Sequence, residues 1–92
     1  MSDTRQGVRA VLSALLGQEL TPDTDDTPLL EIDADRYDSL GVLDCVAELE
    51  RRFTISIDLV EDDLVTNFRT VATITALLDR KLHDARVLGV IS

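Results

Sequence analysis

The sequence predicts an all-α fold, a small four-helix bundle with three long helices, one short helix and a long first loop. Apolar residues recur at helical spacing in three separate segments of the 92-residue chain. Because 45% of the residues are hydrophobic but only 3% are aromatic, we expect an aliphatic core packed between helices. Residues 54–60 alternate like a strand, but no second strand is available to pair with them. They are therefore expected to form a connector.

The first helix is expected to begin at Asp3 or Thr4, either of which can cap it, and to end near Gly17. Its face toward the core comprises Val8, Val11, Leu12, Leu15 and Leu16. Residues 18–37 contain two prolines, many acidic residues and no helical period. They are expected to form a solvated acidic loop, anchored on the core by Leu29, Leu30 and Ile32. A loop of this length usually has a function or contains an unrecognised element.

Two more long helices complete the predicted bundle. The second is expected from about Ser39 to Phe53, and a short helical segment falls within 61–66. Thr70 can cap the last helix, whose apolar stripe comprises Val71, Ile74, Leu77, Leu78 and Leu82. This length allows one domain, 1–92, with a core of about residues 4–83; the sequence leaves the state of the tail, 84–92, open.

The composition argues against several classes of partner and location. A formal net charge of −9 repels nucleic-acid phosphates and anionic membrane surfaces, and attracts basic protein surfaces. No segment is long enough to cross a bilayer, and the first residues lack the basic and continuously apolar parts of a signal peptide. The lone Cys45 can form no internal disulfide, so we expect a cytoplasmic protein without a nucleic-acid or membrane partner.

The second helix has two apolar faces. One is a sufficient core face and comprises Val42, Cys45, Val46, Leu49 and Phe53. Leu40, Leu43 and Ala47 lie on a different flank, close to Asp44. Two explanations remain open: the long loop covers this second row, or the row is a docking strip for another protein.

Ser39 stands at the start of this helix, where a serine is ordinarily a cap. A capping box is absent, because Val42 occupies the position that would need Glu or Gln. Asp38 could cap the helix alone and leave the Ser39 hydroxyl facing solvent. An anion attached to that hydroxyl would lie at the positive end of the helix, so the position suits a serine that carries a phosphodiester.

Nucleophilic catalysis by Ser39 is a weaker interpretation. The sequence around it, "YDSLG", is not a nucleophile elbow. The single histidine, His83, is expected to be a solvated residue near the end of the last helix, with no evident way to activate the serine. Cys45 is expected in the core.

Metal binding is also weakly indicated. Asp23, Asp25 and Thr27 mimic the first positions of a calcium-binding loop. However, Pro28 stands where the loop needs glycine, and Ala34 stands where it needs a bidentate glutamate. The acidic run is therefore expected to be a solvated loop without a metal.

The segment "DSLGVLDCVAELERRFTISI" resembles acyl carrier and peptidyl carrier proteins. The most specific part is Asp38-Ser39-Leu40, followed at the family's spacing by Leu49-Glu50, Phe53, Ile55 and Ile57. The resemblance extends from the first amphipathic helix to Leu82. It implies an acyl-carrier-protein-like bundle.

The resemblance implies that Ser39 is the attachment site of 4′-phosphopantetheine, which a phosphopantetheinyl transferase takes from coenzyme A, with Asp38 as its motif neighbour. Positions that meet partner enzymes in this family are matched by Leu40, Leu43, Asp44 and Ala47. The implied protein is a monomeric carrier of acyl or aminoacyl thioesters. It would catalyse nothing itself.

Two departures bear on the pathway. The glycine that the family often has two residues before the aspartate is absent, and Arg51 and Arg52 make the helix less acidic than in fatty-acid carriers. The chain is more similar to discrete carriers of secondary metabolism and to D-alanyl carrier proteins. This implies polyketide, nonribosomal-peptide or other antibiotic biosynthesis. It also implies loading by an adenylating acyl or aminoacyl ligase or an acyltransferase, followed by ketosynthase, condensation or tailoring enzymes. The alternative is an acidic helical adaptor whose Ser39 is never modified.

Overall fold

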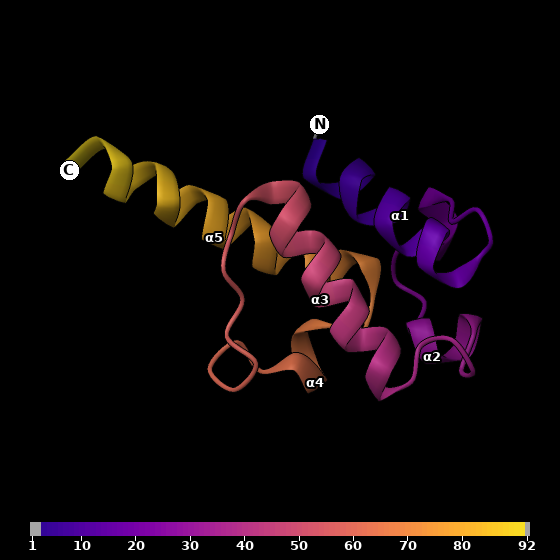
Figure 1. Ribbon diagram of the computed structural model, residues 1–92. Coiled ribbons are helices and arrows are strands. Elements are labelled where there is room, and N and C mark those ends of the chain that lie inside the picture. Colours follow the sequence, from indigo (N-terminus) through magenta and orange to yellow (C-terminus); the bar gives the residue numbers. More distant parts are fainter. Residues whose placement is uncertain (1–2, 92) are drawn as a thin grey trace.

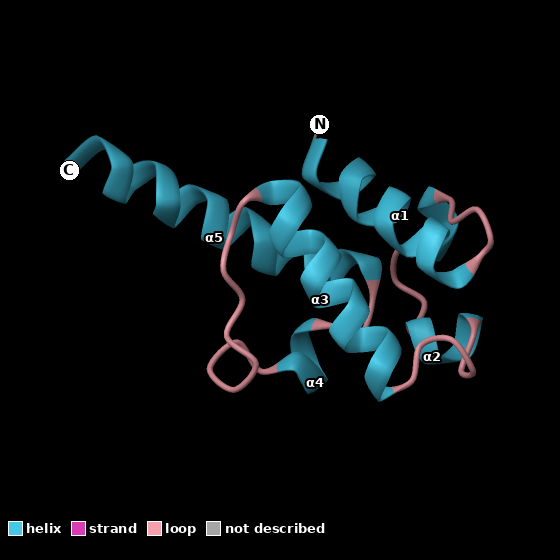
Figure 2. Ribbon diagram, viewed as in Figure 1, coloured by secondary structure: helices cyan, strands magenta, loops and turns pink. Residues whose placement is uncertain are grey.

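The computed structural model describes residues 3–91, with side chains described for residues 4–84. All regular structure in these residues is helical (Figures 1 and 2). The elements are α1 (Asp3–Leu16), the 3₁₀ helix η1 (Pro22–Thr24), α2 (Leu29–Ile32), α3 (Ser39–Phe53), α4 (Leu64–Asn67) and α5 (Val71–Ile91). The prediction of an all-α fold is confirmed, and residues 54–60 form no strand.

The number of short helices differs from the prediction. The long first loop contains η1 and α2, so the described chain has two short α-helices instead of one. The residues expected to anchor a structureless loop, Leu29–Ile32, form α2 itself. Four residues are too few to show a helical period, which is why the sequence pattern did not indicate this element.

The three long helices form the body of the molecule. α1 packs against both α3 and α5, and α4 packs against α5. The C-terminal part of α5 extends beyond the other helices (Figure 1). The backbone of α5 continues to Ile91, past the end of the predicted core. How the tail packs lies outside the described side chains.

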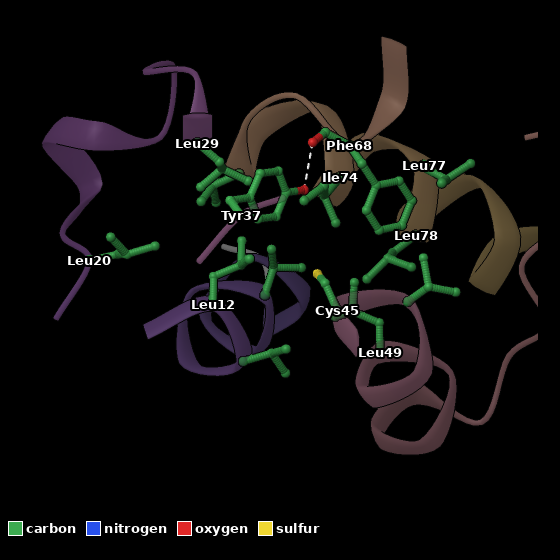
Figure 3. Packing of buried hydrophobic residues seen from close by; sticks show 14 of the residues in the cluster. Leu12, Leu20, Leu29, Tyr37, Cys45, Leu49, Phe68, Ile74, Leu77 and Leu78 are labelled. Carbon is green, nitrogen blue, oxygen red and sulfur yellow. Dashed lines mark hydrogen bonds between the residues drawn. The ribbon is translucent and has the colours of Figure 1, made fainter. Parts of the chain in front are cut away.

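The core is mainly aliphatic, as expected (Figure 3). The predicted stripe of α1 is buried except for the half-buried Leu15, and that of α5 is buried except for the half-buried Leu82. The α3 residues Cys45, Val46 and Leu49 belong to the same core cluster. The two predicted core positions at the ends of this stripe, Val42 and Phe53, are half-buried.

The first loop is tied to the turn that joins α4 and α5. The Leu29 N–H donates to the Arg69 carbonyl at 2.9 Å. The buried Tyr37 hydroxyl donates to the Phe68 carbonyl at 2.6 Å (Figure 3). The expected anchor is only partly confirmed, since Leu29 is buried and Ile32 is half-buried but Leu30 is 59% exposed.

The acidic run is not solvated throughout, which corrects the prediction at Asp25. Its side chain is buried and accepts hydrogen bonds from Arg9 Nε at 2.9 Å and Arg9 Nη2 at 2.7 Å. Arg5 approaches the same carboxylate at 3.4 Å, and the Asp25 carbonyl accepts from the Ala72 N–H at 3.0 Å. Asp25 therefore joins the first loop to both α1 and α5.

This arrangement predicts an acid-dependent loss of stability. The hydrogen bonds from Arg9, and then the positive charges of Arg9 and Arg5, hold the pKa of Asp25 below its usual value despite burial. A carboxylate with a lowered folded-state pKa stabilises above its unfolded pKa of about 3.9, and this contribution is lost as pH falls through the folded pKa. Asp25→Asn should be less stable than wild type at pH 7. The difference should narrow as pH falls from about 4 toward the lower folded-state pKa, because Asp25 is protonated first in the unfolded chain and only then in the folded protein. Urea unfolding at several pH values tests this, and a constant difference would contradict it.

Candidate functional site

The N-terminus of α3 is capped by Asp38 and not by Ser39. Asp38 has an extended backbone, and its Oδ1 accepts from the Gly41 N–H at 2.8 Å. Ser39, the first helical residue, is exposed, and its hydroxyl makes no hydrogen bond to any residue that the structure describes. The predicted division of roles between these two residues is therefore confirmed. The hydroxyl is free to be modified.

The first turn of α3 also carries a partial positive charge. Within residues 3–91, the backbone N–H groups of Ser39 and Leu40 have no hydrogen-bond acceptor, while that of Gly41 is taken by Asp38. Free N–H groups and the aligned peptide dipoles favour a negative charge at this place. A phosphodiester on Ser39 would be stabilised there, whereas a cap made by Ser39 would have occupied the same groups.

Gly41 keeps the segment before Ser39 close to the helix. A Cβ at this buried position would lie 2.0 Å from the Arg36 carbonyl oxygen, which is backbone and cannot rotate away. This role of Gly41 was not predictable from the sequence, because the residue has ordinary helical geometry and nothing in the local pattern indicates the approach of Arg36. Glycine inside the first turn of a helix is the only available signal, since it normally destabilises a helix.

We expect Gly41→Ala to destabilise the protein by roughly 1 kcal/mol. A forced shift of packed backbone typically costs about 1–3 kcal/mol, and the better helix propensity of alanine returns about 0.5–1 kcal/mol. Urea unfolding measures the loss. Unchanged or increased stability would show that the Arg36 segment moves freely, and would contradict the close packing of the two segments.

The second apolar row of α3 is open to solvent. Leu40 is 70% exposed and Leu43 is 45% exposed, and Ala47 and Asp44 are also exposed. The hypothesis that the long loop covers this row is therefore wrong. We call Leu40, Leu43 and Ala47 the α3 strip. It begins next to Ser39 and has the acidic Asp44 on its flank, which is the arrangement a docking surface needs.

A groove lies between α2, α3 and α4. Its volume is about 560 Å³, and its walls are Pro28, Leu30, Glu31, Tyr37, Val42, Leu64, Val65, Phe68 and Arg69. Val42 lies one helical turn beyond Ser39 on α3. Leu30 and Val65 are 59% and 89% exposed. The groove was not predicted from the sequence. Leu29 and Leu30 were both expected to anchor the loop on the core, but adjacent residues of a helix cannot both point inward, and this was a weak indication that Leu30 faces elsewhere.

The other candidate chemical groups lie apart from Ser39 or are already engaged. Among the described side chains none forms a hydrogen bond with the Ser39 hydroxyl, and His83 is exposed on α5. Cys45 is buried as expected, and burial raises its thiol pKa to about 12, so it is a poor nucleophile. Asp25 is engaged by Arg9. Among the described residues, no group of three acidic, histidine or cysteine side chains could hold a metal ion.

None of the described helices combines the length and apolar character needed to cross a bilayer. Comparison of the chain with protein-family models, with curated proteins and with solved structures gives no significant match. An assignment of function therefore depends on the residues and the geometry described above.

Proposed function

We propose that the chain is a discrete carrier protein, similar to acyl carrier and peptidyl carrier proteins, with 4′-phosphopantetheine attached to Ser39. The observation that carries this proposal is the division of roles at the start of α3. Asp38 caps the helix, and the Ser39 hydroxyl is exposed and unbonded among the described residues. On this proposal the three long helices and α4 are the four helices of a carrier bundle, and α2 is part of its first loop.

The attachment itself is a group transfer from coenzyme A. The Ser39 Oγ forms a bond to the phosphorus that bears the pantetheine arm, and the pyrophosphate P–O bond of coenzyme A breaks. Adenosine 3′,5′-bisphosphate leaves, and the hydroxyl proton passes to solvent or to a base of the phosphopantetheinyl transferase. The new phosphodiester lies beside the free N–H groups of Ser39 and Leu40, which favour its negative charge.

The α3 strip supplies the surface that partner enzymes would bind. Its exposed leucines give an apolar contact beside the attachment site, and Asp44 and the net charge of −9 favour a basic rim on the partner. The partners we propose are the transferase, an adenylating ligase or acyltransferase that loads the arm, and ketosynthase, condensation or tailoring enzymes that act on it. The protein itself catalyses nothing and works as a cytoplasmic monomer in polyketide or nonribosomal-peptide biosynthesis.

An unmodified adaptor is the second candidate. The exposed α3 strip suits it equally well, since any helical partner could bind there. The two candidates differ at Ser39: a carrier needs its free hydroxyl for the attachment of phosphopantetheine, whereas an adaptor does not need it.

A fluorescent coenzyme A analogue tests this difference. With a permissive phosphopantetheinyl transferase, the wild type should become covalently fluorescent, as should Ser56→Ala, which changes another exposed serine. The adaptor would remain unlabelled under conditions in which a known carrier is labelled completely.

A further inference from the structure

We propose that Arg69 binds a carboxylate at the far end of the acyl group on Ser39, so that the cargo is an acyl chain with a free acid group. This inference rests on the proposed carrier function. It concerns the groove beside α3, which includes Val42, one helical turn from the attachment site, and has Arg69 in its wall. The position of Val42, one turn from Ser39, is the reason to expect that an arm on Ser39 reaches this groove.

Arg69 is a cation without an anionic partner in the described part of the chain. By contrast, five other basic side chains in this part of the chain form ion pairs: Arg5, Arg9, Arg36, Arg51 and Lys81. Arg52 and Arg80 also form none, but they do not line the groove. The chain has 18 acidic and nine basic residues, so a basic side chain is the less common kind of charge on its surface.

The backbone that bears Arg69 is held in place on two sides. Its carbonyl accepts from the Leu29 N–H at 2.9 Å, and the preceding Phe68 carbonyl accepts from the Tyr37 hydroxyl at 2.6 Å. The guanidinium therefore extends from a fixed turn. The Arg69 side chain is exposed, and its planar guanidinium suits a carboxylate, which it can bind through two parallel hydrogen bonds.

The groove also contains Glu31, and its charge favours a cationic cargo. One observation favours Arg69 as the determinant. Acidic side chains are common on the surface of this chain, whereas Arg69 is the basic residue among those that line the groove. The apolar walls, among them Val42 and Leu64, would contact the methylene groups.

Three cargoes of matched length and different charge test the inference. A permissive transferase loads Ser39 from glutaryl-, hexanoyl- or 5-aminopentanoyl-coenzyme A, and intact mass confirms each product. The glutaryl form should have a melting temperature about 2–4 °C above the hexanoyl form, the shift expected for an ordinary exposed ion pair in a small domain. Arg69→Gln should abolish this difference. Arg52→Gln, which also removes an exposed and unpaired arginine, should retain it, as should Glu31→Gln.

Each other outcome contradicts the inference in a recognisable way. If no cargo is loaded on the wild type, the carrier function and this inference fail together. If all three load but the glutaryl and hexanoyl forms melt alike, the inference fails and the carrier function stands. If the 5-aminopentanoyl form has the highest melting temperature of the three, the groove favours a cationic cargo and the inference is wrong. If unloaded phosphopantetheine alone stabilises the wild type but not Arg69→Gln, the anion at Arg69 is the phosphodiester of the arm.

Discussion

Ser39→Ala is expected to remain folded and to accept no phosphopantetheine. The hydroxyl is the group that would be modified, and no other side chain in the first turn of α3 can replace it. Its loss should change the free energy of unfolding by no more than about 0.5 kcal/mol, because Asp38 supplies the cap and Ser39 is exposed. Alanine is also the better helix former. Urea unfolding and coenzyme A labelling, made on the same preparation, measure both effects.

The two readouts separate a functional serine from a structural one. An Asp38→Ala variant is the matched control, because it removes the cap and should cost about 0.5–2 kcal/mol. If Ser39→Ala lost as much stability as Asp38→Ala, the Ser39 hydroxyl would be a structural group and the carrier assignment would lose its main support.

The largest loss of stability is expected from Val46→Asp. Val46 is 4% exposed and belongs to the core cluster formed with α1 and α5. An unpaired carboxylate there should cost about 3–5 kcal/mol, against a total stability of about 5–15 kcal/mol for a domain of ordinary size. The helical circular dichroism signal and the midpoint of urea unfolding should both fall.

Ala47→Asp is the matched control for this change. It introduces the same charge one residue further along α3, on the exposed α3 strip. Its effect on stability should stay within about 0.5 kcal/mol. Equal losses from the two variants would contradict the orientation of α3 that separates its core face from the strip.

The long helices were predictable because each has an apolar stripe that repeats over several turns. The stripes of α1 and α5, and the Cys45, Val46 and Leu49 face of α3, lie in the core as their spacing required. The cap by Asp38 was predictable for a local reason: Val42 excludes a capping box, and a carboxylate stands immediately before the serine.

The missed features depend on contacts between distant segments. In the sequence, Asp25 is one of several acidic residues in a polar segment. Its burial depends on Arg9 of α1, which is 16 residues away and binds its carboxylate only in the folded protein. The place of Arg69 depends on the first loop, whose Leu29 and Tyr37 bind the turn between α4 and α5. No local period records such pairs, so the groove and its guanidinium emerged only from the structure.

Intact mass after incubation with coenzyme A and a permissive phosphopantetheinyl transferase decides between a carrier and an adaptor. The wild type should gain one phosphopantetheine, located by peptide mapping to the segment that contains Ser39. Ser39→Ala should gain none. An unchanged mass for the folded wild type, alongside complete modification of a known carrier, would contradict the carrier assignment and leave an acidic helical adaptor with an exposed α3 strip.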